Sequence, residues 1–109
     1  MGMTTEREGA ILERAIAKFG SAAQTDMMIE KMSELTKALI KLRRESSSVW
    51  LVRKWPVLIA GLRANVVEEI ADVQIMLNQM QLLYGDCTEW EIKKLERLAE
   101  RLGMEDAEA

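Results

Sequence analysis

Apolar residues recur at helical spacing along most of the chain, and the longest such stretch covers residues 65–84. This stretch contains no Gly or Pro, so it predicts one continuous helix of about five turns. On a helical wheel it carries two apolar stripes with a strip of polar residues between them. The first stripe contains Val66, Ile70, Val73, Leu77, Met80 and Tyr84, the second contains Ala71, Ile75 and Leu82, and the strip contains Glu68, Glu69, Asp72 and Gln79.

The N-terminal half of the chain predicts two further helices. Residues 5–19 form the first, because Gly20 is a good left-handed terminator. Residues 21–44 form the second, with Ser21 as the N-cap. Its expected apolar face consists of Met28, Met32, Leu35, Leu39 and Leu42.

A last helix is expected over residues 88–102, where Thr88 and Glu91 have the spacing of a capping box and Gly103 follows the end. Residues 45–64 precede the long helix. A serine run, Pro56 and Gly61 interrupt this segment, so it is expected to be an ordered connection in which residues 57–62 form at most a turn or two.

Composition supports an all-α chain, because aromatic residues make up only 5% of it and there is one Pro. We expect a single domain over residues 1–109, with residues 1–4 and 104–109 frayed. The net charge of -3 argues against nucleic acid as a partner. No apolar run reaches the roughly 18 residues of a membrane span and the N-terminus lacks the features of a signal peptide, so we expect a cytoplasmic protein without membrane contact.

The chain has no His and a single Cys, Cys87, which excludes ordinary zinc sites, an internal disulfide and catalysis by histidine. Any metal must therefore be bound by oxygen. Glu69 and Asp72 lie between the two apolar stripes, where an uncompensated ionised carboxylate costs several kcal/mol. The acidic strip is therefore expected to line a wet cleft or to hold cations.

The second helix supplies further acids, since Glu30 and Glu34 are one turn apart and Glu34 lies near the edge of the apolar face. Across a helix pair, Glu34 could meet Glu69 and Asp72, and three or four convergent carboxylates suit magnesium. A simpler interpretation of Glu30 and Glu34 is that they form surface ion pairs with lysines on their own helix. Trp50 and Trp55 could stack on a base, although tryptophans between helices more often fill a core or an interface.

Three segments of the chain resemble the all-α nucleoside triphosphate pyrophosphohydrolases, the MazG and dimeric dUTPase-like superfamily. They read MIEKMSELTKALIKLRR, NVVEEIADVQIMLNQM and KKLERLAERL, and they are similar to the short MazG-like proteins of bacteria and phages. The resemblance implies a four-helix MazG-like bundle completed by dimerisation, with some members forming tetramers. It also implies magnesium-dependent hydrolysis of a nucleoside triphosphate to monophosphate and pyrophosphate.

Carried over residue by residue, the resemblance makes Glu34, Glu69 and Asp72 the catalytic magnesium ligands. Three cationic residues of the last helix would contact phosphates, and they are Lys94, Arg97 and Arg101.

The chain departs from the family pattern at Lys31, where the first glutamate of the E-x-x-E motif is expected. Glu30 could replace that ligand if the helix rotates or bulges. Alternatively, the Lys31 ammonium could take the place of one cation and contact phosphate, leaving a single magnesium ion. A third possibility is an inactive site, in which case the chain would be a non-catalytic bundle that binds a nucleotide or a protein, or a helical adaptor unrelated to nucleotides.

Overall fold

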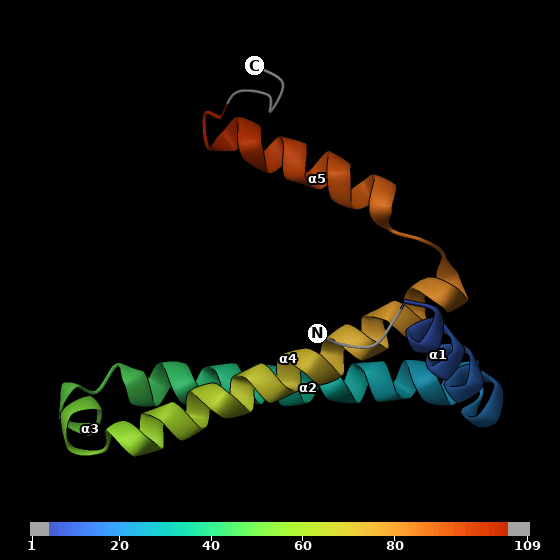
Figure 1. The fold of residues 1–109 in the computed structure, drawn as a ribbon. Coiled ribbons are helices and arrows are strands. Elements are labelled where there is room, and N and C mark those ends of the chain that lie inside the picture. The colour runs from blue at the N-terminus through green and yellow to red at the C-terminus, as the bar shows by residue number, and fades with distance from the viewer. Residues whose placement is uncertain (1–4, 105–109) are drawn as a thin grey trace.

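The computed structural model describes residues 5–104, and these residues form helices only (Figure 1). The residues expected to fray at 1–4 and 105–109 lie outside this range, whereas Met104 is described and follows the last helix. The helices are α1 (Thr5–Phe19), α2 (Ser21–Ser46), α3 (Val49–Lys54), α4 (Pro56–Tyr84) and α5 (Thr88–Arg101). The all-α prediction is confirmed for this part of the chain.

The fold is built on α2 and α4, which run side by side in opposite directions and are joined at one end by the short α3 (Figure 1). Two polar contacts at the other end fix the register of the pair. Gln24 donates to the side-chain oxygen of Gln79 at 2.6 Å, and the hydroxyls of Thr25 and Tyr84 lie 2.6 Å apart. We call the interface between α2 and α4 the seam. The most buried side chains of the two helices line it, and they are Gln24, Met28, Ala38, Val66, Met76 and Gln79.

The face of α2 that meets α4 matches the expected apolar face only in part, since Met28, Leu35 and Leu42 belong to it. Met32 and Leu39 are 44% and 47% exposed, so two members of the expected face point away from the seam. The residues that face α4 instead repeat at alternating intervals of four and three, as in a coiled coil. They are Gln24, Met28, Lys31, Leu35, Ala38 and Leu42. The prediction was wrong for Met32 and Leu39, because the polar residues Gln24 and Lys31 lie on the face that meets α4.

On α4 the acidic strip itself faces α2. Glu69 and Asp72 are half-buried in the seam. The second apolar stripe is exposed to solvent, whereas the first is exposed only in part, because its residue Val66 is buried. Ile70 and Leu77 are 49% and 42% exposed, and Ile75 on the other side is 50% exposed. Packing within one chain therefore half-buries the acids and leaves the second stripe exposed, together with Ile70, Leu77 and Tyr84 of the first.

The expected start of the long helix was wrong, because α4 begins at Pro56 and includes Gly61. Proline is well tolerated in the first helical turn, where its missing N–H has no partner to lose. The preceding Ser48 caps α3 by accepting a hydrogen bond from the N–H of Leu51 at 3.2 Å. What the sequence indicated as a connection is thus mostly helix. None of the helices in the described part of the chain is long and apolar enough to cross a membrane.

The two N-caps expected at hydroxyl residues, Ser21 and Thr88, are not observed. Gly20 is itself the N-cap of α2, with a φ of 90°, so the expected capping by Ser21 is wrong. The expected capping box at Thr88 is also absent, because Thr88 is already the first residue of α5. Asp86 accepts from the Thr88 N–H at 3.0 Å and from its hydroxyl at 2.7 Å, and these hydrogen bonds lower the pKa of Asp86.

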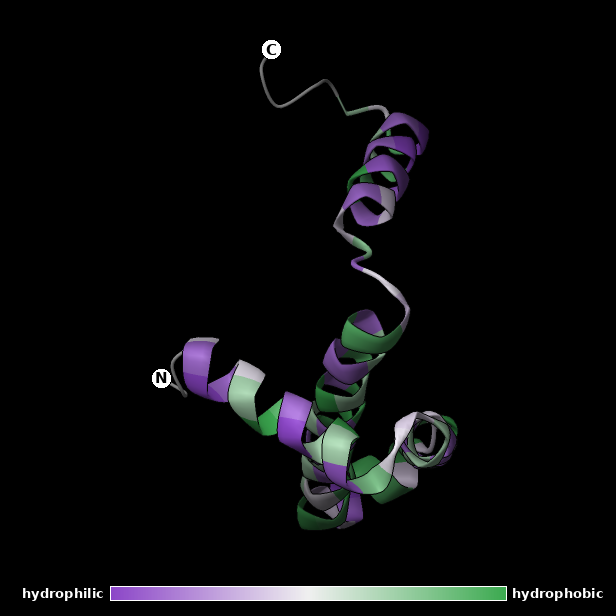
Figure 2. Cartoon of the chain, turned by 90° about the vertical axis from the view of Figure 1, so that its right-hand side faces the viewer, coloured by the Kyte–Doolittle hydropathy of each residue, from purple (hydrophilic) through white to green (hydrophobic). Residues whose placement is uncertain are grey.

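The two remaining long helices differ in how they join the pair. α1 crosses one end of it, where Leu12 is buried and Asn78 of α4 donates to a Glu8 oxygen at 3.2 Å. α5 stands apart from the other four helices in both ribbon views (Figures 1 and 2) and makes no helix contact within residues 5–104. The described residues of one chain therefore do not close into the expected four-helix bundle.

The buried Gln24–Gln79 pair gives the first testable prediction. Gln79→Leu should lower the free energy of unfolding by about 1–3 kcal/mol, because it leaves the Gln24 amide in the seam without its acceptor. The double variant Gln24→Leu, Gln79→Leu should recover much of this loss, since no orphaned amide remains. Urea unfolding at one fixed protein concentration measures both effects, with the exposed Gln74→Leu as control. Equal losses in the single and double variants would contradict the prediction.

Candidate metal centre

Three carboxylates converge in the middle of the α2–α4 seam. Glu34 comes from α2 and Glu69 and Asp72 come from α4, and one oxygen of each lies within 4.8 Å of the others. Glu69 and Asp72 are neighbours because residues three apart lie on the same face of a helix. The antiparallel packing then brings Glu34 against them. The structure thus brings together the three acids that the sequence analysis singled out.

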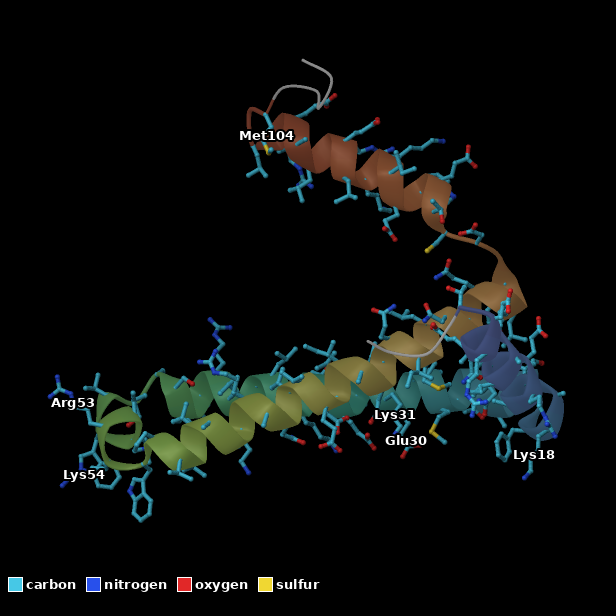
Figure 3. The ribbon with its side chains drawn as sticks, in the orientation of Figure 1. Lys18, Glu30, Lys31, Arg53, Lys54 and Met104 are labelled. Atoms are coloured by element: carbon cyan, nitrogen blue, oxygen red, sulfur yellow. The ribbon has the colours of Figure 1, made fainter. Side chains whose placement is uncertain are left out.

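Lys31 lies within the same cluster. It is labelled midway along the helix pair in Figure 3, one turn before Glu34. Its ammonium donates to Glu34 Oε2 at 3.4 Å and lies 3.6 Å from Asp72 Oδ2 on the opposite helix. The hydrogen bond and charge of Glu34, followed by the charges of Asp72 and Glu69, raise the pKa of Lys31. Lys31 is therefore a cation inside the acidic cluster.

Glu69 is the least compensated member of the cluster. Its Oε2 atom is buried and has no hydrogen-bond partner. Burial raises the pKa of Glu69, and the negative charges of Glu34 and Asp72 raise it further, whereas the charge of Lys31 opposes this shift. An oxygen of this kind is destabilising unless a ligand or a water molecule supplies a partner.

The donor set fits a hard divalent cation. Three carboxylates from two rigid helices offer only oxygen, which magnesium prefers, and the unpartnered Glu69 oxygen is available to a ligand. No His and no second Cys accompanies them in the chain, so a zinc site is not supported. The residues therefore fit a magnesium ion better than a transition metal.

The other predicted site residues do not join the cluster. Glu30 is exposed on α2, outside the group of convergent carboxylates, so it does not replace a ligand at position 31 (Figure 3). The three cationic residues predicted to contact phosphates are exposed on α5, which packs against no other helix of the described chain. They are Lys94, Arg97 and Arg101.

The remaining candidates occupy exposed positions. Trp50 and Trp55 are 60% and 56% exposed in and beside α3, so neither fills the core of a single chain. Cys87 is a free, exposed thiol between α4 and α5.

Two buried polar residues of the seam, besides the acids, were not predicted from the sequence. Gln24 and Gln79 were assigned to no contact, yet they are among the most buried residues of the described chain. The available signal was the alternating spacing of four and three that places Gln24, Met28 and Lys31 in one line on α2. A search for apolar residues alone could not find that line.

No family of known proteins, curated protein or solved structure matches this chain.

The shifted pKa of Glu69 predicts how the metal-free chain responds to pH. A carboxyl group whose pKa is higher in the folded than in the unfolded state favours folding when protonated. That contribution is fully present below the unfolded pKa and is lost as pH rises through the folded pKa. Glu69→Gln should therefore raise the melting temperature at neutral pH and raise it less at about pH 4, where carboxyl groups titrate.

Thermal unfolding in the presence of a chelator measures this difference. The control is Glu68→Gln, which removes the same charge from an exposed position next to Glu69. If Glu69→Gln and Glu68→Gln change the melting temperature equally at both pH values, the cluster does not perturb Glu69.

Proposed function

We propose that this protein is a magnesium-dependent nucleoside triphosphate pyrophosphohydrolase, which releases monophosphate and pyrophosphate. The observation that carries the proposal is the convergence of Glu34 with Glu69 and Asp72 from two separate helices. These acids belong to the two segments that resemble the pyrophosphohydrolases. Helical spacing alone accounts for acids on one face, but not for their meeting across a seam.

The three acids would hold the magnesium ion, and a bound magnesium ion neutralises phosphate charge and lowers the pKa of a water molecule. The side chains of the cluster have separate tasks in this proposal. Glu69 Oε2, which has no hydrogen-bond partner among residues 5–104, accepts a hydrogen bond from a water and orients it. The Lys31 ammonium, held beside Glu34 and Asp72, offers N–H donors to a phosphate oxygen.

One observation favours a second candidate, a non-catalytic bundle that binds a nucleotide or a protein. Lys31 already compensates two of the three carboxylates, Glu34 and Asp72, without any metal. In that case the cluster is a polar layer that fixes the register of α2 against α4, as buried polar residues do in some coiled coils. Pyrophosphate release distinguishes the two candidates.

We also propose that a second copy of the chain covers α5. An isolated helix of 14 residues is marginal in water, so α5 needs a packing partner that the described residues of its own chain do not supply. Its apolar stripe is exposed and consists of Ile92, Leu95, Leu98 and Leu102. A groove beside the start of α5 provides a matching surface on α4, lined by Leu77, Met80 and Tyr84. Self-association would also offer the cationic residues of α5 to a neighbouring acidic cluster.

The proposed self-association can be tested by measuring the mass of the particle in solution. Sedimentation equilibrium should give at least two chains of 12.4 kDa per particle, as expected for a homodimer or tetramer. The variant Leu95→Glu, Leu98→Glu should shift the mass toward one chain, because it places charges on the apolar stripe. Lys93→Glu introduces the same side chain on the opposite face of α5 and should leave the mass unchanged. A monomeric unmodified chain would contradict the proposal.

The activity can be tested by pyrophosphate release from a panel of common and modified nucleoside triphosphates. Turnover should require magnesium, stop in chelator and fall by about 10²–10³-fold in Glu69→Gln, the usual cost of losing a charged catalytic contact. Glu68→Gln should retain activity, since that carboxylate is exposed beside the cluster. If no substrate is turned over, the non-catalytic candidate is favoured.

A further inference from the structure

We infer that Lys31 is a built-in cation of the acidic cluster, and that each chain therefore takes a single divalent cation. This inference rests on the proposed metal site, and it concerns how many ions that site accepts. It follows from the position, contacts and charge of the Lys31 side chain.

The Lys31 ammonium is a positive charge in contact with two carboxylates of the cluster, which is the position that a bound cation would take. Its ammonium contacts one carboxylate on each helix, Glu34 on α2 and Asp72 on α4, at 3.4 and 3.6 Å. Its contacts therefore join the two helices across the seam. Glu69 Oε2 remains without a partner, so the ammonium fills only part of the cluster.

The Lys31 side chain is mostly covered and is joined to both helices by its ion pairs. Lys31 follows Met28 and precedes Leu35 in the line of α2 residues that faces α4, and only 27% of its side chain is exposed. Lysine buries its aliphatic stem against apolar neighbours while the ammonium reaches polar groups. Lys37 on the same helix, in contrast, is exposed. Lys31 therefore stays in the cluster as part of the seam.

The charges of the cluster admit one divalent ion. Three ionised carboxylates and one ammonium leave a net charge of about -2, which one divalent cation neutralises. A second divalent cation would leave the half-buried cluster at about +2, and an uncompensated charge in such a place is unfavourable. With one ion bound, the ammonium of Lys31 is still positive and can meet an anionic ligand.

The test is the number of Mn²⁺ ions bound by the full-length chain, measured from the electron paramagnetic resonance of free Mn²⁺ during titration. The unmodified chain should bind one ion at this cluster, and Lys31→Glu should bind two, because the cluster then carries four carboxylates. Lys37→Glu makes the same charge change at an exposed position and should still bind one. The Glu69→Gln variant should bind no Mn²⁺ at this cluster.

A second variant covers the possibility that Lys31→Glu does not fold without metal. Lys31→Met keeps an unbranched apolar stem and removes only the charge. It should bind one Mn²⁺ roughly tenfold more tightly, because a like charge a few ångströms from the ion is gone. Mn²⁺ should also raise its melting temperature more than that of the unmodified chain.

The outcomes separate this inference from the proposed function. Two ions on the unmodified chain, or one ion on a folded Lys31→Glu chain, would overturn the role of Lys31 and leave the metal site standing. An unchanged Mn²⁺ affinity in Lys31→Met would overturn it as well. If the folded unmodified chain binds no Mn²⁺, the proposed metal site itself is wrong.

Discussion

The structure depends on the antiparallel register of α2 and α4. Polar side chains occupy interior positions at two levels of this seam, the Gln24–Gln79 pair near one end and the acidic cluster in the middle. Sliding one helix by a turn would move each polar group against an apolar neighbour, and an orphaned buried polar group costs about 1–3 kcal/mol. Apolar packing alone would tolerate such a slip much better. The Gln24–Gln79 pair and the acidic cluster therefore favour the register of α2 against α4 in which the three acids meet.

Local spacing was sufficient to predict part of this arrangement. α1 ends before Gly20 and α4 ends at Tyr84, as termination signals indicate, and helix periodicity places Glu69 and Asp72 on one face of α4. Other features depended on tertiary context. Pro56 was interpreted as a break although it starts α4, because a proline is compatible with both a connection and a first turn. The position of α5 could not be predicted, since an amphipathic helix specifies a partner surface but not whose surface it is.

Lys31 has two physical roles that do not exclude each other. Its contacts with Glu34 and Asp72 reduce the repulsion among the acids, so the seam can close in the absence of metal. The same contacts keep a positive charge beside the unpartnered Glu69 oxygen, which is useful to a site that handles phosphate. Lys31 thus changes the electrostatics of the cluster without separating its acids.

The acids of the cluster come from helices of one chain, joined by α3. The three acids therefore come together within one molecule, and dilution of the protein does not change this arrangement. Every copy carries its own complete set of carboxylates, and the number of acidic clusters equals the number of chains in any assembly. Association can alter what surrounds a cluster and which cations approach it. Association cannot be what creates the cluster, because its three acids already converge within a single chain.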